Sequence, residues 1–286
     1  MKKKILITGT TGFLGREFVK FICKEKKFII TELTRAMKNS LSRNNHCKHN
    51  TIFYTDLKNL EKLLSKKKFD YLLHFATHYK KEHAIKDIYA FNEANILFPT
   101  LLLDLLSKNL KKFISFGTMM EHSSKKFSPQ NLYAASKKAF ETLIEFYKIK
   151  NKNCKFYNIK IFDTFNLNDK RKKIIPTLIN NIDHNKKITL DSKNLKMNII
   201  SPLDINNFIL KLLNKNISSD NFILKNKKNT NILKLIKFIE NLKNKKIKLK
   251  IKNNKKNKFF NFQKKYFESK IVYVKFDLEK YLIKNL

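Results

Sequence analysis

Residues 5–16 read ILITGTTGFLGR and carry the strongest structural signal in the chain. The apolar run predicts a short buried strand, and Gly9, Gly12 and Gly15 mark a turn that leads into a helix. Such a turn can bring backbone N–H groups against a pyrophosphate. Gly9 would allow the tight turn, Gly12 the close approach of the backbone, and Gly15 the packing of helix on strand. The spacing G-x-x-G-x-x-G is one residue longer at its start than the usual dinucleotide fingerprint. Its place between a strand and a helix favours a dinucleotide cofactor over a chance glycine-rich loop.

The composition makes these glycines informative, because the chain of 286 residues has only 4 of them. The fourth, Gly117, ends a second apolar segment far downstream. The formal net charge is +39, but nearly all of the basic residues are lysines, whereas base and phosphate recognition favours arginine. We therefore interpret the charge as a solvated lysine surface and expect no nucleic-acid partner; a lysine-driven nucleic-acid binder is the weaker alternative. The hydrophobic content of 42% is that of a globular protein and argues against wholesale disorder.

Short apolar strands alternate with helical patterns over the first half of the chain. Strands are expected at residues 4–8, 28–33, 51–54, 70–75, 112–117 and 156–162, with helices at 60–66, 87–107 and 131–148. This alternation predicts an α/β fold of the Rossmann type, a doubly wound parallel sheet with right-handed crossovers.

The pattern loosens after about residue 163. Helices are expected at residues 174–182, 203–213 and 232–242, a short strand at 221–224, and a mobile loop or edge segment at the lysine- and asparagine-rich residues 243–258. We predict an NAD(P)-binding Rossmann domain over residues 1–165. Residues 166–286 are expected to form a small, mostly helical substrate-binding lobe that is interleaved with the sheet in part.

The end of the second strand bears on the choice of cofactor. An acidic residue there would hold the ribose hydroxyls of NAD. This chain has Thr34 at the position where we expect that acidic residue. Arg35 follows and could pair with a 2′-phosphate, so the sequence slightly favours NADP over NAD. Asp56 and Leu57, after the third strand, are placed to contact adenine; a helix N-cap at Asp56 is the alternative.

A tyrosine and a lysine lie one helical turn apart in the expected helix 131–148. Tyr133 and Lys137 share a face, and an ammonium beside a phenol typically lowers the phenol pKa by about 1–3 units. Tyr133 could then exchange a proton with a substrate hydroxyl or ketone. Thr118, directly after Gly117 at a strand end, could bond the reacting oxygen. In a lysine-rich chain Tyr-x-x-x-Lys alone is a weak signal, but behind an N-terminal glycine-rich turn and a strand ending in Gly-Thr it is a strong one.

Taken together, these motifs resemble those of extended short-chain dehydrogenases/reductases, and more narrowly of the NAD-dependent epimerase/dehydratase family, whose members act on nucleotide sugars. The segment HFAT at residues 74–77 resembles that family's cofactor-lining H-L-A-A, and Asn95 in EANIL its helical V-N-V segment. The resemblance implies catalytic roles for Thr118, Tyr133 and Lys137. The cofactor-binding residues that we predict are Gly9, Thr11, Gly12, Phe13, Leu14, Gly15, Arg35, Asp56, Leu57, Phe75, Ala76, Thr77, Asn95, Tyr133, Lys137 and Phe162.

Residues 132–140 and 162–165 resemble the branch that contains 4-keto-6-deoxy sugar-nucleotide reductases and epimerases. Dehydratases of the family place Asp-Glu directly after the threonine, but this chain has Met119-Met120, which cannot transfer protons. We therefore expect reduction or epimerisation of a nucleotide sugar in surface-glycan biosynthesis. The family's Tyr-Gly-Pro segment is replaced by Phe165-Asn166-Leu167, and a basic nucleotide-binding position by Met197.

Candidate substrate contacts follow the strand ends. They are His78 (with Tyr79 beside it), Glu121, His122, Asp163 and Arg171. Glu121 and His122 could act as a second acid/base, or be surface residues of a loop. Asp163 could instead cap a turn, and Arg171 could instead be solvated at a helix start.

Other signals indicate a cytoplasmic enzyme. No apolar run approaches the roughly 20 residues of a membrane span, and the three cysteines lack metal-ligand spacing, so no membrane contact and no metal are expected. The resemblance implies a possible homodimer. A catalytically idle NAD(P)-binding scaffold or sensor is the alternative function.

Overall fold

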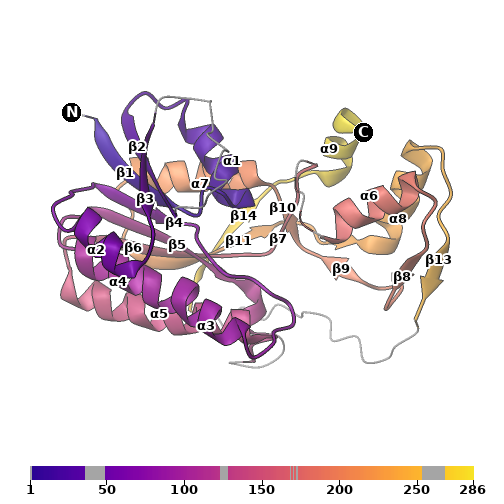
Figure 1. Ribbon diagram of the computed structural model, residues 1–286. Helices are drawn as coiled ribbons and strands as arrows, with labels where there is room; N and C mark the ends of the chain where they lie inside the picture. Colours follow the sequence, from indigo (N-terminus) through magenta and orange to yellow (C-terminus); the bar gives the residue numbers. More distant parts are fainter. Residues whose placement is uncertain are drawn as a thin grey trace.

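The computed structural model describes residues 2–35, 49–122, 128–167, 169, 171, 173–252 and 268–286 (Figure 1). Within these residues the central element is an eight-stranded sheet in which every pair of neighbours is parallel. Its strands, in spatial order, are β14 (Lys270–Val274), β11 (Asp220–Asn226), β6 (Lys155–Ile161), β5 (Lys112–Thr118), β4 (Tyr71–His74), β1 (Lys3–Thr8), β2 (Phe28–Arg35) and β3 (Asn50–Tyr54). The predicted doubly wound parallel sheet is confirmed.

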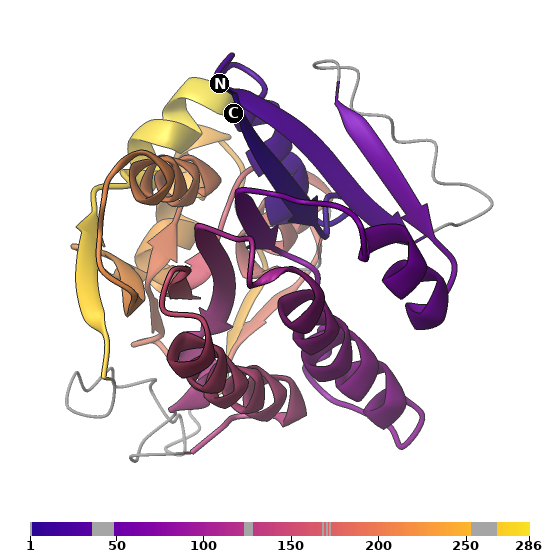
Figure 2. The same ribbon diagram turned by 90° about the vertical axis from the view of Figure 1, so that its left-hand side faces the viewer.

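The alternation of side chains along β1 explains why helices cover both faces of the sheet. Ile5 and Ile7 belong to one apolar core with α1 (Phe13–Ile22) and α7 (Pro202–Asn214), whereas Leu6 belongs to another on the opposite face. That second face is covered by α2 (Leu57–Leu64), α4 (Phe98–Leu106) and α5 (Leu132–Lys150) (Figures 1 and 2). The sheet is therefore buried between two layers of helices.

The helix expected at residues 87–107 is divided. It consists of α3 (Asp87–Asn92), a π-helical segment η1 (Glu93–Leu97) and α4. Asn95 lies within η1 and is completely buried. The apolar spacing of the sequence predicts a helix but does not reveal this local change of winding, which often accompanies functional positions.

The C-terminal lobe has its own core, built by α6 (Ile174–Asp183), α8 (Ile232–Leu242) and α9 (Leu278–Asn285) (Figure 1). Three two-stranded pairings accompany these helices: β7 (Asp163–Thr164) with β10 (Ile199–Ile200), β9 (Lys196–Met197) with β12 (Thr230–Asn231), and β8 (Ile188–Leu190) with β13 (Leu249–Ile251).

The described part of residues 243–258 contains an edge strand. These residues were expected to form a mobile loop or edge segment, and β13 lies within them at the edge of a two-stranded pairing with β8. The pairing depends on contacts between distant segments and not on a local apolar pattern. Residues 253–258 lie outside the described residues. None of the described helices has the length and apolar character needed to cross a membrane.

Candidate active site

The glycine-rich turn joins β1 to α1 and lies against the loop that follows β4. Gly9 has a φ of +71°, and a Cβ there would come within 2.3 Å of the Ala76 nitrogen. A Cβ on Gly15 would come within 2.3 Å of the Gly9 carbonyl oxygen. Backbone therefore occupies the space that side chains would need at both positions. The sequence predicts close helix–strand packing at Gly15 and a tight turn at Gly9, and the φ of Gly9 is one that other residues rarely adopt.

The N-terminus of α1 fits a phosphate group. Gly12 is its N-cap, no described side chain caps it, and its first turn holds no acidic residue. Its amides and partial positive charge are thus directed toward the turn, as anion binding requires. Of the other residues predicted there, Thr11 is exposed, Leu14 is half-buried and Phe13 is buried.

A buried histidine ties β1 to β4 beside this turn. The Thr8 hydroxyl lies 2.9 Å from His74 Nδ1 and accepts a hydrogen bond of 3.3 Å from the Ala76 amide. Burial, with the nearby Lys137 charge, holds the pKa of His74 well below its usual value, so its imidazole is neutral. Phe75 and Ala76, both predicted to line the cofactor, are thereby held against the glycine-rich turn.

Asn95 links the loop after β4 to α5. Its side-chain oxygen accepts from the His78 amide at 2.7 Å and the Thr77 hydroxyl at 3.0 Å. Its side-chain nitrogen donates to the His78 carbonyl at 3.0 Å and the Ser136 hydroxyl at 2.9 Å. All four hydrogen-bonding positions of the amide are satisfied, so the structure indicates that Asn95 positions its neighbours.

Tyr133 lies in the first turn of α5, whose N-cap Asn131 accepts from the Ala134 amide at 2.9 Å. The ring of Tyr79 packs edge-on against that of Tyr133, with 4.9 Å between centroids. Thr77 forms a hydrogen bond with the Tyr133 side chain. The loop after β4 therefore reaches the tyrosine predicted to transfer protons.

The pKa of Tyr133 is shifted in the opposite direction to the one that the sequence predicts. Burial and the negative charge of Glu121 raise the pKa of Tyr133 above its usual value, although the sequence predicted a lowered one. Burial lowers the pKa of Lys137 to about 8. In this environment the removal of water outweighs nearby positive charge, so Tyr133 is held as the protonated phenol.

Thr118 ends β5 and is buried. Its hydroxyl accepts from the Met120 amide at 3.2 Å, and Glu121 Oε1 accepts from the Thr118 amide at 3.1 Å. These reciprocal bonds form a capping box around the short 3₁₀ helix η2 (Met119–Glu121). The threonine hydroxyl is thus fixed at the strand end, and its proton can still be donated.

Two further residues at this strand end are at least as buried as Thr118. Glu121 is fully buried and ion-paired with Lys160, so it offers no exposed surface to a ligand in this structure. His122 is also buried. Sequence reasoning missed Lys160 and Glu141, the buried partners of this cluster. The available signal was the pair Asn158 and Lys160, two polar residues two positions apart in a buried strand.

Arg171 and Asp163 lie on the lobe side of the site. Arg171 bonds to Asp169 and, at 2.9 Å, to the Thr164 hydroxyl, and its guanidinium lies 4.4 Å from the centroid of the Phe13 ring. Asp163 lies 3.6 Å from Lys173 Nζ, and burial raises the pKa of its carboxyl. Arg171, predicted to contact the substrate, therefore lies beside the first residue of α1.

His78 and Phe162 both pack against other side chains of the protein. His78 is half-buried, packs edge-on against Phe91 and lies 3.9 Å from Asp87. Phe162 is partly buried against Met119.

The residues predicted for the adenosine end of the cofactor are already bonded within the chain. Arg35 forms an ion pair with Glu93, and both side chains are about half exposed. Asp56 caps α2 by accepting from the Asn59 amide at 2.9 Å, which is the alternative role noted for it, and Leu57 is the first residue of α2.

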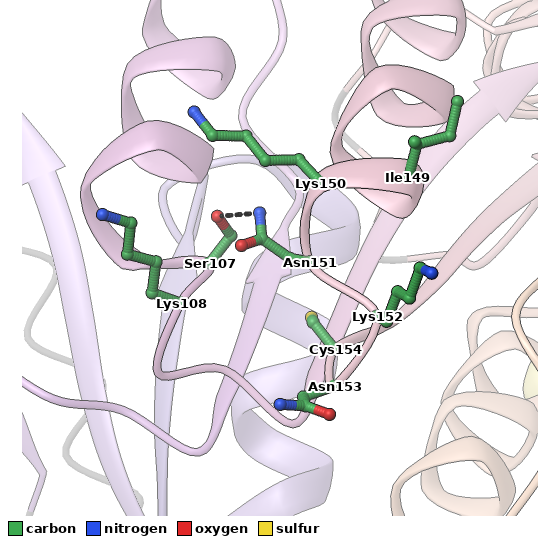
Figure 3. Close-up of a pocket in the computed structure, with 8 residues that line it drawn as sticks. All are labelled: Ser107, Lys108, Ile149, Lys150, Asn151, Lys152, Asn153 and Cys154. Atoms are coloured by element: carbon green, nitrogen blue, oxygen red, sulfur yellow. Dashed lines mark hydrogen bonds between the residues drawn. The ribbon is translucent and has the colours of Figure 1, made fainter.

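A cavity of about 330 Å³ lies elsewhere, where α4 and α5 end (Figure 3). Its lining residues are Ser107, Lys108, Ile149, Lys150, Asn151, Lys152, Asn153 and Cys154. These residues precede β5 and β6, so they lie at the amino edge of the sheet, whereas ligands of doubly wound folds bind at the carboxyl edge. Among the described residues no group of side chains is arranged to hold a metal ion.

Several known proteins are similar to this chain in sequence. The chain is 27% identical to CDP-abequose synthase from Salmonella muenchen over 225 residues, which cover 78% of this chain and 74% of that protein. It is 29% identical to dTDP-D-glucose 4,6-dehydratase from Dictyostelium discoideum over 217 residues, which cover 66% of this chain and 50% of that protein.

Solved structures share the fold. One is UDP-glucose 4-epimerase from Thermotoga maritima with UDP-glucose, which has a TM-score of 0.77 at 16% identity and coverage of 98% of this chain and 96% of that one. Another is UDP-glucuronic acid 4-epimerase from Bacillus cereus in complex with NAD, with a TM-score of 0.72 at 21% identity, covering 87% of this chain and 85% of that one. The model of the NAD dependent epimerase/dehydratase family matches residues 5–223. The chain therefore belongs to that family.

Proposed function

We propose that this protein is an NAD(P)-dependent enzyme that reduces, or alternatively epimerises, a nucleotide-activated 4-keto-6-deoxyhexose for surface-glycan synthesis. The observation that carries the proposal is that Thr118, the glycine-rich turn and the loop after β4, whose Tyr79 packs on Tyr133, all follow the carboxyl ends of strands of one parallel sheet. The similarity to CDP-abequose synthase supports a sugar nucleotide as the substrate.

The residues around the turn fit a dinucleotide. The N-terminus of α1 would hold the pyrophosphate, and Lys137 the nicotinamide ribose. When bound, the nicotinamide supplies or accepts the hydride at the sugar carbon. Tyr133, held as the protonated phenol, donates its proton to the ketone oxygen and is reprotonated from solvent. Thr118 orients that oxygen through its hydroxyl.

Dehydration is the least favoured reaction of the family for this chain. The two residues after Thr118 are Met119, which is buried, and Met120, whose sulfur lies 3.9 Å from the side-chain nitrogen Nδ2 of Asn131. Thioethers carry no exchangeable proton, so neither residue can act as the acid or base that elimination of water needs.

For the cofactor we propose a preference for NADP. Arg35 ends β2, and its partner Glu93 is about half exposed, so this surface ion pair costs little to exchange for a 2′-phosphate. Glu32, the acidic residue of β2, is buried and 2.8 Å from His49. Titration of both cofactors tests the preference, and equal or tighter binding of NAD would contradict it.

We also propose a homodimer that forms through α3 and α5. These helices expose apolar side chains, among them Tyr89 and Ile149, which are 80% and 76% exposed. Such side chains on neighbouring helices are suited to burial against a second copy. Sedimentation analysis would test this assembly.

The function is tested by incubating the protein with a panel of sugar nucleotides that includes CDP-linked 4-keto-6-deoxyhexoses, and by following nicotinamide absorbance and product mass. Stoichiometric loss of the reduced cofactor indicates a reductase, whereas product formed without net change indicates an epimerase. The Tyr133→Phe variant is the matched control, and we expect it to lose about 10²–10⁴-fold in turnover while retaining cofactor binding. Unchanged turnover in this variant would contradict the role of Tyr133, whereas cofactor binding without turnover by the wild type would favour the idle scaffold.

A further inference from the structure

A cluster of charged side chains is buried beneath the end of β5. Lys160 Nζ bonds to both Glu121 Oε2 and Glu141 Oε2. Lys160, Glu121 and Glu141 are 1%, 0% and 5% exposed, and they come from β6, η2 and α5. Buried ion pairs are often no more stabilising than apolar packing of the same volume, so stability alone is a weak reason for such a cluster.

The two carboxylates differ in what else they contact. Glu141 accepts from Lys138 Nζ at 2.8 Å and from Asn158 Nδ2 at 3.0 Å, both away from the reacting groups. Glu121 instead accepts from the Thr118 amide at 3.1 Å. Glu121 is therefore the member of the cluster that connects Lys160 to the turn bearing Thr118.

Gly117 shows how closely these side chains pass over β5. A Cβ at Gly117 would come within 3.0 Å of both Glu121 Oε1 and Lys160 Cγ. The register of the sheet places Gly117 directly opposite Lys160. The glycine thus leaves room for the Glu121 side chain to fold back across the strand, which fixes the position of its carboxylate.

We propose that Glu121 is a positioning residue for proton transfer. Lys160 anchors its carboxylate, which holds the turn at Thr118 and keeps one negative charge near Tyr133 and Lys137. This inference rests on the proposed function. It replaces the expectation from the sequence that Glu121 contacts the substrate.

The groups that face Tyr133 come from three elements, and Glu121 stands out among them. Glu121 and Tyr79 raise the pKa of Tyr133, whereas Thr77 and Arg171 lower it. Glu121 is also the one described charge that shifts the pKa of Lys137, which it raises against the lowering caused by burial. A fixed carboxylate at this place favours the protonated forms of both groups.

The groups that face Glu121 itself are charged as well. Burial raises the pKa of the Glu121 carboxyl above its usual value and Glu141 adds to this rise, whereas the ammonium of Lys160 opposes it. The Thr118 amide also opposes this rise. Glu121→Gln preserves the size of the side chain and an acceptor for that amide but removes the charge, so it isolates the electrostatic part of the proposal.

The test is the titration of Lys137 in protein labelled with ¹³C at lysine Cε, with and without NAD⁺. A lysine with a pKa of about 8 is resolved from ordinary lysines, and its signal is assigned by its loss in Lys137→Met. We expect Glu121→Gln to lower the pKa of Lys137 by about one unit. Glu141→Gln is the matched control, because Glu141 is buried against Lys160 just as Glu121 is. This variant should leave the titration of Lys137 unchanged.

Equal effects of the two glutamine variants, or none from Glu121→Gln, would overturn the proposal. If Glu121→Gln does not fold, the double variant Glu121→Gln, Lys160→Met removes both charges together and should shift Lys137 in the same direction. Where the wild type turns over a sugar nucleotide, Glu121→Gln should also displace the pH profile of kcat. A wild type that turns over none of the sugar nucleotides would instead contradict the proposed function, while the lysine titration would still decide the role of Glu121.

Discussion

Replacing Asn95 by alanine should destabilise the protein strongly, because one buried amide holds two segments together. Four hydrogen bonds of 2.7–3.0 Å are lost, two of them with the backbone of His78. At about 1 kcal/mol for each bond, the free energy of unfolding should fall by about 4 kcal/mol. For a chain of this size that corresponds to a decrease in Tm of roughly 7 °C.

The assay is urea and thermal unfolding of Asn95→Ala beside Asn92→Ala. Asn92 lies on the neighbouring helix α3 but is exposed, so its replacement should change stability by no more than about 0.5 kcal/mol. If the two variants differ by less than about 1 kcal/mol, the four bonds do not hold the loop and helix together as argued.

Three further changes have definite expected outcomes. Gly15→Ala should abolish NAD(P) binding in calorimetric titration, because its Cβ would lie 2.3 Å from the Gly9 carbonyl oxygen. In Gly12→Ala the Cβ would lie 3.2 Å from the same oxygen, so this variant should bind NAD(P) more tightly than Gly15→Ala does. The pKa of Lys137 is about 8 in the folded protein and 10.5 when unperturbed, so between these values the unfolded chain binds more protons and stability should rise with pH by up to about 3 kcal/mol. Urea titrations should show this rise in the wild type and its loss in Lys137→Met; parallel curves would contradict the assignment. Arg35→Ala should weaken NADP binding at least tenfold and NAD binding little, and equal losses would show that Arg35 does not contact the 2′-phosphate.

The central sheet could be predicted from the sequence because each of its strands from β1 to β6 is a short apolar run. The strands β13 and β14 could not, since both are at most half-buried and are defined by partners far away in the sequence. The π-helical turn around Asn95 likewise keeps the apolar spacing of an ordinary helix.

The candidate site could be predicted where a motif is local. The glycine-rich turn and the spacing of Tyr133 and Lys137 are of this kind. The environment of Glu121 is not, because its partner Lys160 lies 39 residues away and is brought to it by the pairing of β5 with β6. Even so, Asn158 and Lys160 are two polar residues on one face of a buried strand, and that pattern predicts a buried polar partner.

The packing of α7 against α1 has a consequence for synthesis of the chain. The Asn206 side chain donates to the Glu17 carbonyl, and the apolar face formed by α1 and β1 is closed by α7. These two partners are 189 residues apart, so at about 5–20 residues per second a ribosome needs about 10–40 s to deliver the second after the first. During that interval the apolar face of α1 and β1 lacks the helix that later covers it, so the nascent chain exposes a surface that chaperones bind.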